Sequence, residues 1–251
     1  MAFPLTINLS YGQEKVETSE QKQKLGTRAT TSDGRVFYYA ENGGTAIDHG
    51  GYLVDGLAAV AAHDMDVAAA ATSAGETTFT SGTSLTTTKD QYKDGYLYFN
   101  DGPGQGETYK VKSNTAVSGA TGLSITIDEP DGLRTALTTS SLFGLMYSPY
   151  KDIKIIDGDG TMTTGVIGVT VIPVTADYFC WVQTAGPCSV RLGAQVGVVG
   201  DGIAVSQASG ESGEAERTDY SDESDLTNIG VAMGIPAVDS DNQWCMLNIR
   251  Q

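Results

Sequence analysis

The stretch that decides the fold class is YFCWVQTAGPCSVRLG, at residues 178–193. Its aromatic and β-branched residues are typical of strands, and the Gly-Pro pair near its middle is typical of a turn. The pattern predicts two strands, at 178–183 and 189–192. Similar runs lie at 153–156, 166–173, 203–206, 229–233 and 243–249, and glycine-rich turns separate the runs every eight to twelve residues or so in much of this region. Such spacing favours a β-sandwich or barrel in residues 151–251 over alternating strands and helices.

The N-terminus has the pattern of an extended segment. Apolar residues alternate with other residues near the start of the chain, at Phe3, Leu5, Ile7 and Leu9. Residues 13–24 are almost wholly polar and hold no apolar stripe for a helix to bury. We therefore interpret residues 1–25 as an extended N-terminal arm, which is able to add a strand to another subunit. The alternative is a strand that docks on its own subunit.

Residues 26–150 are predicted to form a β-rich domain around a small antiparallel unit. The clearest turn is DGPGQG at 101–106, between alternating runs at 96–100 and 109–112. Residues 57–75 are rich in alanine, and we expect a short helix there, with strand as the alternative. The predicted fold is therefore mainly β: an extended N-terminal arm, a small antiparallel β unit and a C-terminal β-sandwich or barrel at 151–251.

The charge balance excludes several partners. The chain has 251 residues, with 15 Lys and Arg against 31 Asp and Glu, a net charge of −16. Such an acidic chain does not attract a phosphate backbone or an anionic membrane, so we expect no nucleic-acid and no membrane partner. No apolar run approaches the ~20 residues that span a bilayer, and the N-terminus lacks the pattern of a signal peptide. We expect synthesis in the cytoplasm with reduced thiols.

No pattern of catalytic residues stands out. His49 and His63 lie near no Gly-x-Ser-x-Gly elbow, and no Ser-His-acid set suggests itself. Cys180, Cys188 and Cys245 lack the paired spacing of a zinc site. We interpret them as buried structural thiols, with a Cys180–Cys188 bridge across a hairpin as the alternative. We expect no enzymatic activity; a β-rich hydrolase that uses paired carboxylates is the minor alternative.

The acidic and glycine-rich loops are likewise interpreted as turns or solvated loops rather than binding sites. The DGDGT segment at 157–161 does not complete a calcium loop, and residues 102–106 lack the spacing of a phosphate-binding loop, so both are expected to be turns. Residues 207–226 are predicted to be an exposed loop. Its acids at 219–225, and those at 239–241, are interpreted as solvated, with a cation site as the alternative. We predict no cofactor and no metal.

Aromatic residues in the strands are expected to build the core rather than a platform for sugars. Phe179, Trp181 and Trp244 are predicted to be structural core residues.

Four segments together resemble the head decoration, or cement, proteins of tailed bacteriophages. They are LGTRATTSDGRVFYYAENGG at 25–44, DGPGQGETYKVKSNTAV at 101–117, the stretch at 178–193, and NIGVAMG at 228–234. The similarity is to scattered segments over about half of the chain. It implies a virion structural protein without catalytic residues, which binds the outer surface of an expanded capsid, often as a trimer, and strengthens the head.

The resemblance sets the functional expectations. The partners are the major capsid protein and further copies of this chain as a homotrimer, and the location is the outer capsid surface after assembly in the host cytoplasm. We predict contacts to the capsid or a neighbouring subunit at Phe3, Leu5, Tyr11, Arg28, Arg35 and Phe37. The main alternative is a head-fibre or tail-associated adhesion module that binds host-surface glycans. A tail or neck component is a further alternative.

Overall fold

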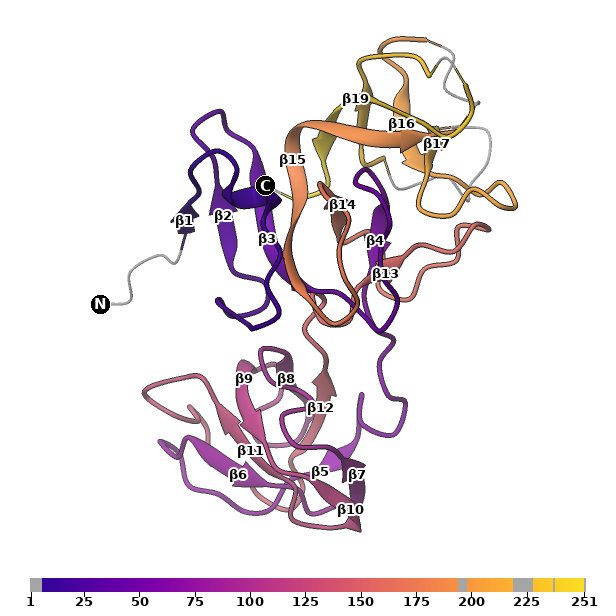
Figure 1. The fold of residues 1–251 in the computed structure, drawn as a ribbon. Helices are drawn as coiled ribbons and strands as arrows, with labels where there is room; N and C mark the ends of the chain where they lie inside the picture. Colours follow the sequence, from indigo (N-terminus) through magenta and orange to yellow (C-terminus); the bar gives the residue numbers. More distant parts are fainter. Residues whose placement is uncertain (1–5, 194–197, 219–227, 237, 251) are drawn as a thin grey trace. The chain divides into compact units, whose positions relative to one another are not determined.

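The computed structural model describes residues 6–193, 198–218, 228–236 and 238–250. The chain divides into two compact units (Figure 1): unit 1 comprises Met1–Leu57 and Pro149–Gln251, and unit 2 comprises Ala58–Ser148. Strands hold 41% of the residues and helices 1%, which confirms the mainly-β prediction. In the described part of the chain, no helix is long and apolar enough to cross a bilayer.

This division differs from the predicted domains at 1–25, 26–150 and 151–251. Unit 2 is an insertion between two parts of unit 1. Residues 26–57 belong with the C-terminal part because strand β3 (Val36–Glu41) pairs antiparallel with β15 (Phe179–Leu192), from Phe179 opposite Glu41 to Ala185 opposite Val36. Strand pairing across such a separation leaves no mark in local sequence patterns.

One half of unit 1 is a sheet in the order β1-β2-β3-β15. Its strands besides β3 and β15 are β1 (Thr6–Asn8) and β2 (Arg28–Thr30), flanked by β4 (Leu53–Asp55), β13 (Lys154–Ile155) and β14 (Gly168–Thr170). A short 3-10 helix, η1 (Gln13–Lys15), follows β1. Trp181 is buried in this core and Phe179 packs against it partly buried, as predicted.

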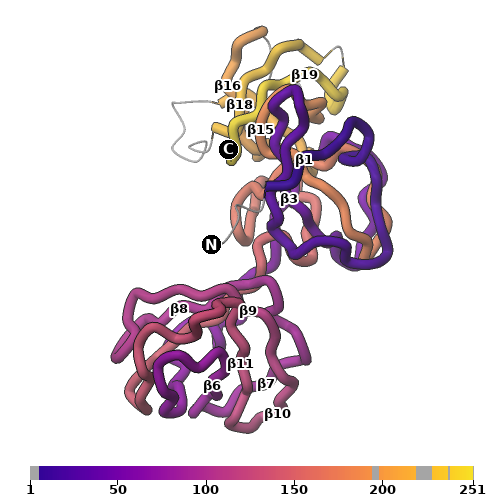
Figure 2. The backbone as a smooth tube through the Cα atoms, turned by 90° about the vertical axis from the view of Figure 1, so that its left-hand side faces the viewer, coloured from indigo at the N-terminus to yellow at the C-terminus, as the bar shows by residue number. Residues whose placement is uncertain are grey.

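The other half of unit 1 is a five-stranded barrel. Its strands are β15, β17 (Ala215–Arg217), β16 (Gly202–Val205), β18 (Gly230–Ala232) and β19 (Asp241–Asn248). They pair in that order, and the barrel closes because β19 also pairs with β15 (Figures 1 and 2). The predicted C-terminal barrel is therefore confirmed.

Strand β15 is continuous, whereas the sequence predicted two strands and a turn. Its first half pairs with β3 and its second half with β19. Gly186 has a φ of 87°, which glycine adopts without strain, and a register irregularity lies between Gln183 and Ala185. The Gly-Pro pair therefore marks a change of partner within one strand. Because Cys180 and Cys188 share this strand, a bridge between them across a hairpin is excluded.

Unit 2 is a curled six-stranded sheet with an aromatic core. Its strand order is β5 (Val67–Ala68), β12 (Leu142–Met146), β8 (Tyr96–Asp101), β9 (Thr108–Asn114), β11 (Ser124–Ile127) and β6 (Thr78–Thr80). Strands β7 (Leu85–Thr87) and β10 (Val117–Ala120) form a separate pair. The hydrogen bond from Ala70 N to Thr80 O, 2.8 Å long, links the two edges of the curled sheet.

Two local predictions for this unit have opposite outcomes. The turn at 101–106 is confirmed, because β8 and β9 form an antiparallel pair around it. The short helix expected in residues 57–75 is wrong, and the segment contains β5 instead. Val67 and Ala69 are buried on either side of the half-exposed Ala68, so burial at alternate positions outweighs the helix propensity of alanine.

Candidate binding surface

The outer wall of the barrel carries exposed apolar side chains. Along β19, Cys245 and Leu247 point into the barrel and are buried. The alternating positions point outward, so Trp244 is 61% exposed and Met246 is 41% exposed.

Strand β18 extends this surface. Val231 lies opposite Met246 in the strand register and is exposed. The backbone N–H of Met233 donates to the carbonyl of Trp244 over 2.8 Å, and the Met233 side chain is also exposed. We call Val231, Met233, Trp244 and Met246 the apolar face. Methionine and tryptophan are enriched at protein interfaces and uncommon on free surfaces, so this face has the composition of a contact surface.

The prediction that Trp244 is a core residue is wrong. Residues 244–247 are all apolar or sulfur-bearing, so the sequence does not show which alternating set is buried. The register with β15 decides it, because Cys188, on the inward side of β15, lies opposite Cys245. Trp244 therefore belongs to the outward set.

Two hollows border the apolar face. The first has a volume of about 610 Å³, and its lining includes Trp244, Arg35, Lys15, Arg191, Asp241 and Asn242. The second has a volume of about 560 Å³, and its lining includes Val231, Met246, Arg28, Val36 and Asn248. The lining of each hollow thus includes apolar residues and at least one arginine. A partner surface that fits this region needs apolar area at its centre and acceptors around it.

Arg35 is held in place by its neighbours. Its Nε donates to Asp33 Oδ2 over 2.9 Å, its Nη2 lies 3.3 Å from Glu14 Oε1, and its guanidinium stacks over the Phe37 ring at 5.4 Å. Glu14 is buried, so this ion pair is shielded from solvent. Arg35 therefore presents a fixed rather than a mobile donor group to the first hollow.

The predicted contact residues have different outcomes. Phe3 and Leu5 lie outside the described residues. Tyr11 is 66% exposed, and its hydroxyl accepts a hydrogen bond from Ser32 Oγ over 2.8 Å. Arg28 and Arg35 line the two hollows. Phe37 is fully buried in the core of unit 1, so the prediction that it makes an external contact is wrong.

The described part of the N-terminal segment is not a free arm. Strand β1 pairs in parallel with β2, with Ile7 opposite Ala29, and Leu9 is buried in the same core. Thr18 and Phe179 exchange backbone hydrogen bonds of 2.9 and 3.0 Å. From residue 6 onward, the N-terminal segment therefore docks on its own subunit, which was the alternative to a free arm. A short apolar alternation does not specify which chain supplies the partner strand.

The two histidines lie in different units and differ in exposure. His49 is exposed beside Asp48, with 3.6 Å between Nε2 and Oδ2. His63 is buried in unit 2, where its Nδ1 lies 2.5 Å from the Tyr92 hydroxyl. Burial lowers the pKa of His63 and raises the pKa of Tyr92. A neutral histidine that is paired with a buried tyrosine has a packing role.

The cysteines are free and buried, as predicted. Cys188 and Cys245 lie opposite each other across β15 and β19 inside the barrel. Burial raises the pKa of Cys180, Cys188 and Cys245 to about 12. The thiols therefore remain protonated near neutral pH and are poor nucleophiles and metal ligands.

The acidic loops are partly ordered by their own contacts. The DGDGT segment is a turn as predicted: Gly160 N donates to Asp157 O over 2.9 Å, and Asp159 Oδ1 accepts from Thr161 N over 2.9 Å. Residues 219–225 lie outside the described residues. Within 207–218, the prediction of an exposed loop is wrong, since this segment contains β17 and a buried Glu214.

Comparison of the chain with protein-family models, with curated proteins and with solved structures finds no match.

Proposed function

We propose that this protein is a virion structural protein that binds the outer surface of a phage capsid as an oligomer and stabilises the head. The apolar face is the observation that carries this proposal. It places a tryptophan and two methionines together on a rigid barrel wall, flanked by arginine-lined hollows. The occupant is the major capsid protein, and the segment resemblance to head decoration proteins supports that choice.

The proposed mechanism is contact without chemistry. A tryptophan at the centre of an interface contributes through the apolar area that it removes from water, and flanking arginines add orientation. One such patch gives a modest affinity. A trimer places three patches on one particle, so the second and third contacts form at high effective concentration. Binding across neighbouring capsid subunits then resists outward pressure on the shell.

The direct test mixes the purified chain with expanded heads that lack it. The readouts are co-sedimentation and the position of the added density in electron micrographs, and mass photometry of the free protein gives the oligomeric state. The proposal expects saturable binding at symmetry-related sites on the outer surface. Density on tails only, or no binding to heads at any concentration, contradicts it.

A specific observation also favours the adhesion module as a second candidate. Trp244 borders the 610 Å³ hollow together with Asp241, Asn242 and Arg191. An exposed aromatic ring beside polar side chains is the composition of sugar-binding sites. The second tryptophan, Trp181, is buried, so quenching of the exposed tryptophan's fluorescence by a host oligosaccharide would support this candidate. An unchanged spectrum across a glycan panel would count against it.

A further inference from the structure

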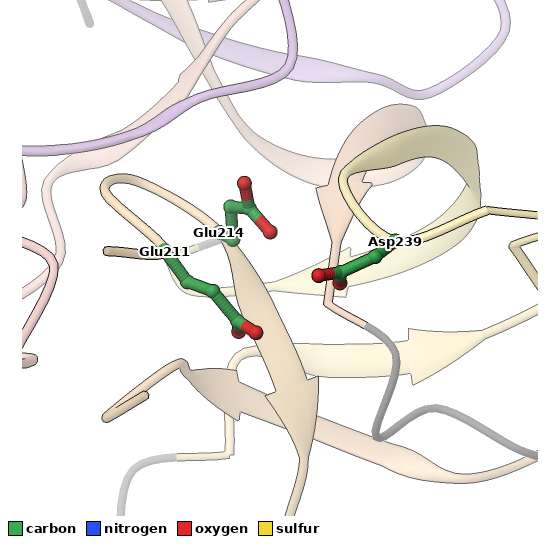
Figure 3. A group of neighbouring side chains, drawn as sticks. All are labelled: Glu211, Glu214 and Asp239. Atoms are coloured by element: carbon green, nitrogen blue, oxygen red, sulfur yellow. The ribbon is translucent and has the colours of Figure 1, made fainter. Parts of the chain in front are cut away.

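Three acidic side chains meet at one end of the barrel. Glu211 and Glu214 precede β17, and Asp239 lies in the loop before β19. One carboxylate oxygen of each lies within 4.8 Å of one from each of the others. Figure 3 shows the Glu214 and Asp239 carboxylates directed toward each other, with Glu211 beside them. Such proximity of like charges is unfavourable unless a cation offsets it.

Glu214 supplies an independent indication of a ligand. Its side chain is only 3% exposed, and its Oε1 accepts from Arg191 Nε over 2.8 Å. Its Oε2 is fully buried and has no hydrogen-bond partner. A buried carboxylate oxygen without a donor carries a large desolvation penalty, so a native structure normally satisfies it with a donor or a metal ion.

The local charges favour a divalent cation. Within the cluster, Glu214 is paired with the guanidinium of Arg191, which is held over the Tyr52 ring at 5.3 Å. The three carboxylates of the cluster together carry three formal negative charges, which attract a divalent cation more strongly than a monovalent one. Because Arg191 already occupies Oε1 of Glu214, the unpartnered Oε2 is the oxygen left for the ion.

The number of carboxylates favours calcium over magnesium. Ca²⁺ accepts oxygen ligands in flexible geometry, whereas Mg²⁺ demands a near-ideal octahedron and is usually held by only one or two carboxylates. Three carboxylates within 4.8 Å of one another therefore suit Ca²⁺ better. Three protein oxygens are fewer than the 6 to 8 that Ca²⁺ takes, so water fills the remaining positions.

We infer that Glu211, Glu214 and Asp239 form a Ca²⁺ site that ties the loop before β17 to the loop before β19. With three protein ligands, the dissociation constant should fall at about 10⁻⁴ to 10⁻³ M, the range of extracellular calcium modules. This site is independent of the proposed capsid contact.

The test is calorimetric titration of the full chain, stripped with EDTA and dialysed, with CaCl₂ and separately with MgCl₂. Thermal unfolding is measured in parallel. We expect one Ca²⁺ site, at least tenfold weaker Mg²⁺ binding, and a higher melting temperature with Ca²⁺. Asp239→Asn and Glu214→Gln should each weaken Ca²⁺ binding at least tenfold. Asp239 is exposed, and a glutamine at position 214 still accepts from Arg191, so both variants are expected to fold.

Asp241→Asn is the matched control. It removes one charge at the first residue of β19, where the side chain accepts from Val238 N over 3.1 Å and is not part of the cluster. The Ca²⁺ affinity of Asp241→Asn should stay within twofold of that of the parent chain. The inference is overturned if the parent binds no Ca²⁺ up to about 10 mM, tenfold above the weakest expected constant. It is equally overturned if both cluster variants bind normally, or if the control loses as much affinity as they do.

Discussion

Truncation of Trp244 to alanine should separate binding from folding. The side chain stands on the outer barrel wall, and it is 61% exposed in the isolated chain. Its removal leaves no cavity in the core, so the free energy of unfolding should change by no more than about 0.5 kcal/mol. Capsid affinity should fall instead, because the largest apolar surface of the apolar face is lost.

The magnitude follows from the exposed area. A tryptophan offers up to about 250 Å², so an exposed fraction of 61% corresponds to about 150 Å² open to a partner. At ~25 cal/mol per Å², complete burial of that area is worth at most about 4 kcal/mol. Tryptophans at interface centres cost ~2 kcal/mol or more when truncated. The loss should therefore be about 2 to 4 kcal/mol per site, or roughly 30- to 800-fold in dissociation constant.

The assay is co-sedimentation of labelled protein with expanded heads over a concentration series, together with thermal unfolding of the same preparations. Tyr96→Ala is the matched control, since Tyr96 is an exposed aromatic residue in unit 2. It should bind as the parent does. If Trp244→Ala binds heads within threefold of the parent, the apolar face is not the contact surface. If it lowers the unfolding free energy by several kcal/mol, Trp244 supports the fold and the reasoning fails.

Three further predictions concern stability and reactivity. Phe143 is fully buried and meets Phe79 edge-on at 5.2 Å, so Phe143→Ala should destabilise unit 2 by about 3 to 5 kcal/mol in calorimetry; a loss below ~1 kcal/mol would contradict the assigned core. Burial lowers the pKa of His63 below 6.5, so as the pH falls His63 becomes protonated in the unfolded chain before it does in the folded chain. The stability contributed by neutral His63 is therefore complete above pH ~6.5 and is lost as the pH falls toward the folded pKa. Urea titrations at several pH values should show that His63→Gln loses less unfolding free energy at acid pH than the parent chain does. The buried thiols, with pKa values of about 12, should react with a disulfide reagent only after unfolding, and rapid native labelling would refute this.

The sequence predicted local structure correctly where the deciding contacts join residues that are close together in the chain. The mainly-β class, the turn at 101–106 and the DGDGT turn follow from glycine placement and alternation over a few residues. The buried character of Cys180 and Trp181 follows from their aromatic and apolar neighbours. None of these features depends on which distant segment packs against them.

Only the tertiary structure decided which strands meet, and that choice determines the candidate sites. Glycine and proline at 186–187 look like a turn, but pairing with both β3 and β19 keeps β15 continuous. Trp244 points outward because the register with β15 turns Cys245 inward. Glu211, Glu214 and Asp239 become neighbours only when the barrel closes. Strand register and closure depend on packing between residues far apart in the chain, and a shift of one residue reverses which side chains are exposed.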